Sequence, residues 1–346
     1  MKKTSTTRHD TQAAGASTFQ RLSLAGLGLA FGGLTALGIA DLARASAGGQ
    51  PPAAHGAATE VRQSASASLG ARLAKPLKVH TVSSTGKLSD LFRRVGYELD
   101  GVHKIGPVPR VLLASLPKDL ANLSRAAQRK IVFIQCILPL VLQANEHVTR
   151  ERLRILDLQD RVLGGKKLTG AEKAWLAEVA DRYGLERVDF ASLLERVDIV
   201  PPSLAIAQAA EESGWGTSRF AREGNALFGQ RIYKDNRPGI VPTERGEGES
   251  YKVRAFDHLL QGVAAYVHNL NSHFAYDGFR EARAGMRGER GVIEGYRLVE
   301  TLERYSERGE TYLETIKLIM RVNKLQLLDR AWLRDLSDEF AVPPDA

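Results

Sequence analysis

Residues 204–216 read Leu-Ala-Ile-Ala-Gln-Ala-Ala-Glu-Glu-Ser-Gly-Trp-Gly, and this stretch decides the fold. Six of its first seven residues are apolar, so a helix formed here is apolar on every side and belongs in the centre of a core. Pro201 and Pro202 stand directly before it, where proline can start a helix. The predicted helix ends in a glutamate pair, Glu211 and Glu212, followed by Ser213 and Gly214.

A carboxyl group at the end of a buried helix has an unusual environment. Burial disfavours its ionised form, and the helix C-terminus carries partial negative charge, so both effects raise its pKa. A carboxyl that stays protonated near neutral pH can act as a general acid. Glu212 lies one turn beyond Gln208, whereas Glu211 is rotated by about 100°. Only one of the two needs to face a site, and the alternative interpretation is a solvated pair beside a C-cap glycine.

Two motifs carry a family resemblance. Residues 207–216, followed by Asn-Ala-Leu-Phe-Gly at 225–229, resemble the signature of glycoside hydrolase family 73, the peptidoglycan N-acetylglucosaminidases that include flagellar muramidase-like proteins. The preceding helical region and residues 306–312 resemble its Bax-type branch. The resemblance to the catalytic domain covers roughly residues 195–325, and the resemblance to the branch reaches back to about residue 90. It implies a lysozyme-like fold, with a helical lobe, a small β lobe and a sugar-binding cleft between them.

The resemblance also implies catalytic residues. The family's catalytic acid directly precedes Ser-Gly-Trp-Gly and maps onto Glu212, while Glu211 stands where a small or apolar residue is usual. Glycoside hydrolysis usually needs a second carboxyl group. By its position before the predicted strand of the β lobe, Glu244 resembles the family's second glutamate, and Glu247 and Glu249 remain its rivals. The N-acetyl group of the substrate offers another route, because it can replace a second carboxylate as an internal nucleophile.

Sugar rings are usually bound by aromatic faces, although core packing is the commoner role of any single aromatic residue. Tyr305 resembles a tyrosine that lies close to the catalytic glutamate in the family, so we expect it to be catalytic. The family's second motif commonly reads Asn-x-Phe-Gly, and here one extra residue separates Asn225 from Phe228. Trp215 could instead brace the end of the catalytic helix. The candidates for substrate binding are Trp215, Asn225, Phe228, Tyr276 and Tyr312.

Several other helices follow from local signals. Ser124 is a candidate N-cap for a helix whose apolar stretch, 131–142, is too short to span a membrane and therefore predicts a core helix. Pro139 would kink it. A second helix is expected from Thr149, and the capping-box spacing of Thr169 and Glu172 opens a third.

The β lobe is predicted from alternation. Residues 250–256 alternate as a half-buried strand does, with a partner expected at 228–233 or 239–241. Asp257 is a candidate N-cap for the next helix, which carries one apolar stripe. The stripe consists of Leu259, Leu260, Val263, Val267 and Leu270. A last helix is expected from about residue 310 to 322.

The N-terminus resembles an export signal. Four basic residues, Lys2, Lys3, Arg8 and Arg21, precede an uncharged run at 22–40. Small residues follow it and favour cleavage near Ala45 or Ala47. The alternative is an uncleaved membrane anchor. Either form places the bulk of the chain outside the cytoplasm, in the periplasm or at the cell surface, and leaves room for a transient membrane contact through the N-terminus.

Charge and composition limit the partners. The formal charge is +8, and residues 1–45 carry five basic and two acidic side chains, so the exported part has +5. A basic exported protein suits an anionic cell wall, and export argues against nucleic acid. Cys136 is the only cysteine, so the chain can form no internal disulfide. The histidines lack metal-ligand spacing, and no nucleotide-binding fingerprint is present, so we expect no metal and no cofactor.

The sequence as a whole predicts an α+β fold, mainly helical, in which a lysozyme-like domain with a small β lobe follows a helical extension. The predicted segments are a signal peptide (1–47), a flexible linker (48–75), a mostly helical extension (76–197), the glucosaminidase domain (198–330) and a C-terminal tail (331–346). The predicted activity is cleavage of the peptidoglycan glycan strand at N-acetylglucosamine, with Glu212 as general acid. The alternatives are a lytic transglycosylase and a non-catalytic cell-wall-binding protein whose working part is the extension.

Overall fold

The computed structural model describes residues 78–233, 236–243, 250–290 and 293–334. The predicted signal peptide and linker lie outside this range. The described part is mainly helical with short strands, which confirms the predicted α+β class. The helices are α2 (Thr85–Arg94), α3 (Leu99–Ile105), α4 (Ala126–Leu163), α5 (Gly170–Arg182), α6 (Phe190–Arg196), α7 (Pro202–Ser213), α8 (Arg219–Gly224), α9 (Leu259–Ser272), α10 (Asp277–Arg290), α11 (Gly295–Leu298) and α12 (Glu310–Val322). Single-turn or short 3-10 segments are η1 (Leu120–Asn122), η2 (Phe274–Tyr276), η3 (Val299–Tyr305) and η4 (Leu325–Arg330).

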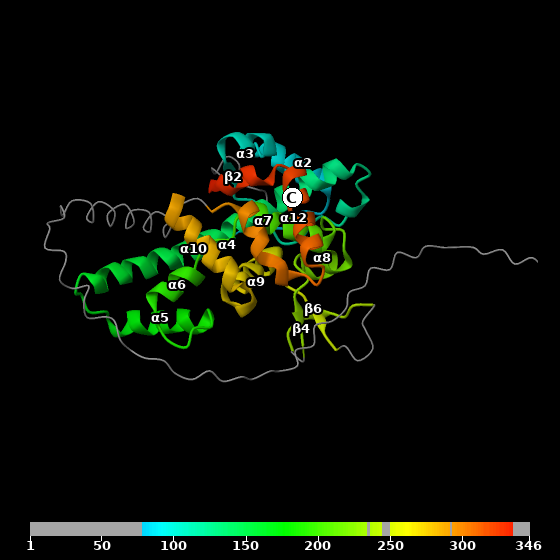
Figure 1. Cartoon of the computed structure of the whole chain (residues 1–346). Helices are drawn as coiled ribbons and strands as arrows, with labels where there is room; N and C mark the ends of the chain where they lie inside the picture. Colours follow the sequence, from blue (N-terminus) through cyan, green and yellow to red (C-terminus); the bar gives the residue numbers. More distant parts are fainter. Residues whose placement is uncertain (1–77, 234–235, 244–249, 291–292, 335–346) are drawn as a thin grey trace, which may run out of the picture.

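Helix α7 is the central helix that the sequence predicts. It packs against α4, α11, α12 and η4, and every residue from Pro202 to Ala210 is buried (Figure 1). Its N-terminus is held by Asp329, whose carboxylate accepts hydrogen bonds from the backbone N and Oγ of Ser203 at 2.9 and 2.8 Å. Its C-terminus is closed by Gly214 in the left-handed conformation. The core of the molecule is therefore built around α7.

Helix α4 differs from the prediction of two helices. It is one continuous helix of 38 residues, it begins after Arg125 instead of Ser124, and it passes through Pro139 and the expected break before Thr149. A proline inside a helix costs about 3 kcal/mol, but here the surrounding residues are buried against α7 and α9. Asn145 also binds the backbone of Val200 through both its amide atoms, at 2.8 and 3.1 Å. Tertiary contacts thus keep the helix intact.

The apolar part of α4 is a core segment, as predicted. The helix is long and apolar enough to cross a membrane by length and composition. However, 83% of its most apolar window is buried inside the protein. Its apolar face is thus already covered by the other helices.

The remaining helices mostly follow their local signals. The capping box at α5 is present, because Thr169 and Glu172 exchange backbone-to-side-chain hydrogen bonds of 3.3 and 2.8 Å. Helix α12 has the predicted limits. The apolar stripe of α9 is buried, but the residue at its N-cap is His258 and not Asp257. This helix begins one residue later than the sequence suggested.

The β lobe is a three-stranded antiparallel sheet with the order β4 (Arg231–Ile232), β6 (Lys252–Arg254) and β5 (Gly239–Ile240). Val253 in the middle of β6 pairs with Arg231 on one side and with Ile240 on the other, so both predicted partners flank the same strand. A separate small cluster of buried side chains, Ala226, Tyr251 and Val253, forms the interior of this lobe. The lobe projects from the helical body beside α9 and α8 (Figure 1).

The extension and the following domain share one core. A single cluster of buried apolar side chains runs from Val82 to Leu333 and crosses the boundary predicted at residue 197. Two parallel strand pairs reinforce this part: β1 (Val79–His80) with β3 (Leu112–Leu113), and β2 (Pro107–Pro109) with β7 (Trp332–Arg334). Strand β7 lies in the segment predicted to be a C-terminal tail. It runs beside β2 in Figure 1.

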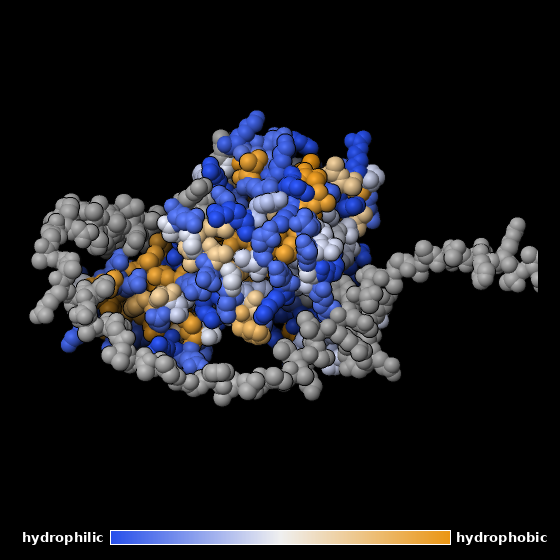
Figure 2. Space-filling view, viewed as in Figure 1, coloured by the Kyte–Doolittle hydropathy of each residue, from blue (hydrophilic) through white to orange (hydrophobic). Residues whose placement is uncertain are grey.

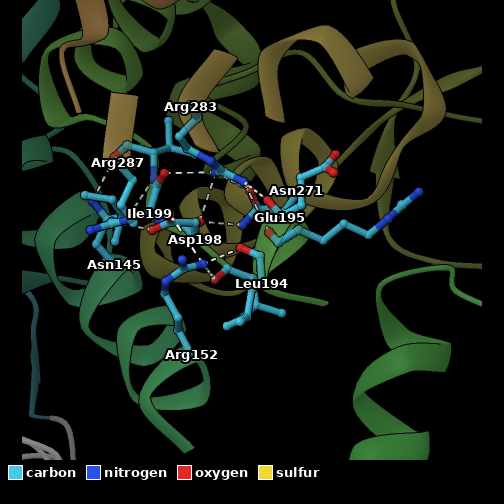
Figure 3. Close-up of polar contacts among 12 residues, drawn as sticks. Asn145, Arg152, Leu194, Glu195, Asp198, Ile199, Asn271, Arg283 and Arg287 are labelled. Atoms are coloured by element: carbon cyan, nitrogen blue, oxygen red, sulfur yellow. Dashed lines mark hydrogen bonds and ion pairs between the residues drawn. The ribbon is translucent and has the colours of Figure 1, made fainter. Parts of the chain in front are cut away.

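A buried ionic centre holds three parts of the helical body together: the segment at Asp198, α10 and α4 (Figure 3). The carboxylate of Asp198, which is 2% exposed, accepts hydrogen bonds of 2.6 and 2.5 Å from Arg287 of α10. Arg152 of α4 lies 3.5 Å away. Arg283 donates to the backbone oxygens of Asp198 and Ile199 at 3.0 and 2.9 Å. Burial opposes ionisation, but the hydrogen bond from Arg287 and the nearby charges of Arg283 and Arg152 hold the pKa of Asp198 below its usual value.

We expect Asp198→Asn to lower the free energy of unfolding by about 3 to 5 kcal/mol, because it leaves the buried Arg283 and the partly buried Arg152 and Arg287 without their counter-charge. Urea unfolding of the purified protein measures this. Asp90→Asn is the matched control, because the Asp90–Arg93 ion pair is exposed and such pairs contribute about 0 to 1 kcal/mol. Equal effects of the two substitutions would contradict a fastening role for Asp198.

Candidate active site

Glu212 occupies the last turn of α7, and the chain turns sharply directly after it. Gly214, Trp215 and Gly216 have φ values of 57°, 58° and 78°, three successive left-handed residues. Glycine adopts this conformation without strain, while tryptophan does not. Trp215 is held there by packing edge-on against Phe133, with ring centroids 5.7 Å apart. A Cβ on Gly216 would lie 2.5 Å from the side chain of Leu116, so this position of the turn requires glycine.

The environment of Glu212 favours its protonated form. Burial raises the pKa of the Glu212 carboxyl from 4.5 to about 7. The hydrogen bond from Tyr312 and the charge of Arg308 oppose this shift, and the charge of Glu211 adds to it. Desolvation is the dominant cause, as expected for a carboxyl group at the end of a buried helix. Glu212 therefore changes its protonation state near neutral pH.

A chain of three buried side chains leads to Glu212. Tyr266 of α9 donates a hydrogen bond from its hydroxyl to Gln208 Oε1 at 2.7 Å. Gln208 Nε2 donates to the hydroxyl oxygen of Tyr312 at 2.9 Å, and the Tyr312 hydroxyl donates to the Glu212 carboxylate. Each group uses its donor toward the next one, so the direction of the chain is fixed. This series of hydrogen bonds ends in the Tyr312 hydroxyl, which is a donor to Glu212.

Glu211 is engaged elsewhere. Its Oε1 atom accepts a hydrogen bond of 2.6 Å from Arg308, on the segment before α12. The same guanidinium lies over the ring of Tyr312, 5.2 Å from its centroid. The ion pair holds Glu211 away from the hydrogen-bond chain and ties the end of α7 to the segment that carries Tyr312. Of the two glutamates, only Glu212 receives the tyrosine's hydrogen bond.

The motif at residues 225–229 places the backbone of Gly229 close to the carboxyl group of Glu212. Phe228 is buried and stacks on Tyr266 with ring centroids 3.9 Å apart. Gly229 has a φ of +60°, and a Cβ on it would lie 3.7 Å from Glu212 Oε2. Asn225, also left-handed, donates from Nδ2 to the backbone oxygens of Phe256 and Asp257 at 3.0 and 3.2 Å. Although this motif has an extra residue, Phe228 and Gly229 lie close to the end of helix α7.

The tyrosines differ from the expected arrangement. Tyr312, expected to bind substrate, is 1% exposed and hydrogen-bonds to Glu212. Tyr305, expected next to the acid, stacks on Tyr312 at 5.6 Å and lies 6.0 Å from Tyr276. Phe228 and Tyr276 are also buried. Phe228, Tyr276 and Tyr312 are thus largely buried in the core, and their part in substrate binding stays a prediction.

Like Tyr305, Trp215 is only partly buried. Lys130 Nζ lies 5.0 Å from its ring centroid. Its contact with Phe133 braces the end of α7, so substrate binding by Trp215 stays a prediction. Glu244 and its rivals Glu247 and Glu249 lie outside the described residues. Within the described ranges, no group of three or more His, Cys, Asp or Glu residues could hold a metal ion.

Sequence reasoning did not assign a role to Gln208, Tyr266 or Arg308. Gln208 had a signal, because it is the one polar residue in the apolar run at 204–210. Tyr266 had none, because it belongs to a helix whose neighbouring positions are apolar. Arg308 could not be paired with Glu211 from the sequence, since 97 residues separate the two.

The chain is similar to several known proteins. The family model described as mannosyl-glycoprotein endo-beta-N-acetylglucosaminidase matches residues 188–325. Protein bax of Escherichia coli (strain K12) is 35% identical over 205 residues, which is 58% of this chain and 71% of that protein. Peptidoglycan hydrolase FlgJ of the same strain is 31% identical over 132 residues, 35% of this chain and 40% of FlgJ.

Among solved structures, the catalytic domain of the autolysin Auto from Listeria monocytogenes matches with 16% identity and a TM-score of 0.29, covering 49% of this chain and 94% of that domain. The match to protein bax is the one that decides the family, because it spans more than two thirds of that relative. The chain belongs to the glucosaminidase family of glycoside hydrolases, family 73, in its Bax-type branch.

Proposed function

We propose that the protein hydrolyses the glycan strand of peptidoglycan at N-acetylglucosamine, as an endo-β-N-acetylglucosaminidase with Glu212 as the general acid. The observation that carries the proposal is the position of Glu212, which is desolvated at the end of a buried helix and bound by a tyrosine hydroxyl. The similarity to FlgJ, a peptidoglycan hydrolase, supports peptidoglycan as the substrate. The predicted export signal would deliver the enzyme to the cell wall in the periplasm or at the cell surface.

Glu212 would protonate the oxygen of the leaving sugar. A general acid works best when its pKa is near the operating pH, and burial places the pKa of Glu212 at about 7. Once the proton has left, the Tyr312 hydroxyl still donates to the carboxylate and stabilises the new charge. Gln208 and Tyr266 hold that hydroxyl in place through their own hydrogen bonds. Because all three side chains are buried, the acid keeps one orientation.

A second group must support the positive charge that develops on the sugar or activate water. We propose Glu244 for this role, with Glu247 and Glu249 as alternatives on the same segment. The N-acetyl group of the substrate is the remaining candidate. Single Gln substitutions at the three glutamates separate these routes, since a protein-supplied carboxylate requires that one of them lowers turnover by several powers of ten.

We expect Glu212→Gln to abolish release of sugars from purified peptidoglycan sacculi while leaving the fold intact, because an amide cannot donate the proton. Reducing-end analysis of the soluble fragments measures both rate and bond type. Glu211→Gln is the matched control and should retain most activity, since Glu211 binds Arg308. Near wild-type turnover of the Glu212 variant would refute the assignment, and anhydro-sugar products from the wild type would instead identify a lytic transglycosylase.

The raised pKa of Glu212 also predicts how stability changes with pH. The carboxyl ionises near 4.5 in the unfolded chain and near 7 in the folded protein, so rising pH through this window favours unfolding. The full shift corresponds to about 3 kcal/mol. We expect Glu212→Gln to remove this loss and to be more stable than the wild type at pH 8, but not at pH 4. Urea unfolding at both pH values tests this, and identical pH dependence of the two proteins would contradict it.

Tyr312→Phe removes the hydroxyl that binds Glu212. That hydrogen bond lowers the pKa of the acid, so its loss should move the alkaline limb of the pH–rate profile to higher pH. We expect kcat to fall about tenfold or more. Tyr97→Phe is the control, because Tyr97 is buried and its hydroxyl has no hydrogen-bond partner within the described residues.

The same assay decides between the two tyrosines. We expect Tyr305→Phe to keep the wild-type pH profile, because the hydrogen bond that lowers the pKa of Glu212 comes from Tyr312, on which Tyr305 stacks. A shifted profile for Tyr305→Phe together with an unshifted one for Tyr312→Phe would restore the role that the family resemblance gave to Tyr305.

A further inference from the structure

An ion pair lies directly beside the proposed acid, at the end of α7. Glu211 precedes Glu212 in the chain, and its Oε1 atom accepts a hydrogen bond of 2.6 Å from the guanidinium group of Arg308. The partners are 97 residues apart in the sequence. The pair therefore places one charge of each sign next to Glu212 and joins the end of α7 to the segment before α12.

The two charges act on Glu212 in opposite directions. The negative charge of Glu211 raises the pKa of Glu212, and the positive charge of Arg308 lowers it. Within the described residues, these are the two formal charges that act on this carboxyl group. Because the partners are in contact, their effects oppose each other at the acid, and desolvation remains the main cause of its raised pKa.

The other titratable groups near Glu212 are tyrosines. Tyr312 donates a hydrogen bond to it, and three more, Tyr266, Tyr276 and Tyr305, lie close enough for its charge to act on them. Desolvation raises the pKa of all four hydroxyls, so they stay uncharged where Glu212 ionises. Helices α4 and α11 and segment η4 also pack against α7, but in the described part of the chain they contribute no charge that acts on Glu212.

The pair lies at the protein surface, over the ring of the tyrosine that binds the acid. The guanidinium group of Arg308 is 5.2 Å from the ring centroid of Tyr312. The side chain of Arg308 is 48% exposed and that of Glu211 is 22% exposed. Most of the molecular face seen in Figure 2 is hydrophilic. Water and salt reach such a surface pair, so its electrostatic effect on Glu212 depends on ionic strength.

We propose that Arg308 is a positioning residue whose ion pair with Glu211 balances the charge beside Glu212 and thereby sets the upper pH limit of activity. This inference rests on the proposed function, in which the protonated form of Glu212 is the active one. Removing either partner leaves the charge of the other uncompensated. The two single substitutions should therefore move the limit in opposite directions, and their combination should restore it.

The test measures the alkaline limb of the pH–rate profile for release of sugars from sacculi. Glu211→Gln leaves the charge of Arg308 unopposed, so its limb should move to lower pH by about half a unit or more. Arg308→Gln leaves Glu211 unopposed, and its limb should move to higher pH by a similar amount. One pH unit above the wild-type limb, the rates should be about threefold lower and about threefold higher. The double variant should match the wild type.

Two further variants separate charge from support of the segment before α12. Arg308→Lys keeps the charge and should hold the limb near its wild-type position. Lys317→Gln removes the ion pairs of Lys317 with Glu300 and Glu314 and should leave the limb in place. High salt should reduce the shifts of both single variants, because it screens the uncompensated charge.

The sign of the shift decides the outcome. Loss of structure alone does not depend on which charge is removed, so limbs that stay in place or move in the same direction in the two single variants would overturn the inference. A limb that moves as far in Arg308→Lys as in Arg308→Gln would do the same. If Arg308→Gln does not fold, Glu211→Gln decides alone, since only a shift to lower pH agrees with the inference.

A direct titration makes the test independent of activity. In the full-length chain labelled with carbon-13 at its glutamate carboxyl groups, the Glu212 signal is the one lost in Glu212→Gln. Its midpoint should be lowest in Glu211→Gln, intermediate in the wild type and highest in Arg308→Gln. The same order in a protein that releases no sugar would uphold the charge balance and refute the proposed function. Equal midpoints in an active enzyme would refute the charge balance alone.

Discussion

Burial of helix α7 on all its sides is the constraint on which the rest of the structure depends. An apolar helix with no solvated face needs neighbours all around it, and α4, α11, α12 and η4 supply them. The carboxyl group of Glu212 stands where this helix leaves the core, so it is desolvated by the same packing that stabilises the fold. The groups that reach it come from other helices of the body, Tyr312 from α12 and Tyr266, through Gln208 of α7, from α9.

The site shows how a protein keeps a carboxyl group protonated without leaving it unbound. Burial raises the pKa of Glu212, and a single tyrosine donor limits that rise. Glu211 adds negative charge next to the acid, but Arg308 binds it directly. The pair of glutamates therefore has two separate functions: one is held by an ion pair at the surface, and the other by a hydrogen-bond chain in the interior. Their different surroundings follow from a rotation of about 100° along the helix.

Local patterns predicted the parts of the structure that local forces decide. The buried helix at 202–213, the capping box of α5, the limits of α12 and the strand flanked by both candidate partners could all be recognised from spacing and alternation. The continuity of α4 could not, because its polar residue Asn145 is satisfied by Val200, far along the chain. Which tyrosine binds Glu212 also depends on tertiary contacts. The family resemblance favoured Tyr305, whereas the hydrogen bond comes from Tyr312, on which Tyr305 stacks.

The parallel pairing of β2 with β7 has a consequence for the order of folding. Almost the whole described chain lies between Pro107 and Trp332, yet these residues are partners in one sheet. Bringing such distant segments together has a large entropy cost, which local contacts do not offset. The strand that completes this sheet is also the last described element to be synthesised. Strand β2 must therefore wait for β7, whereas β1 can pair with the nearby β3 earlier.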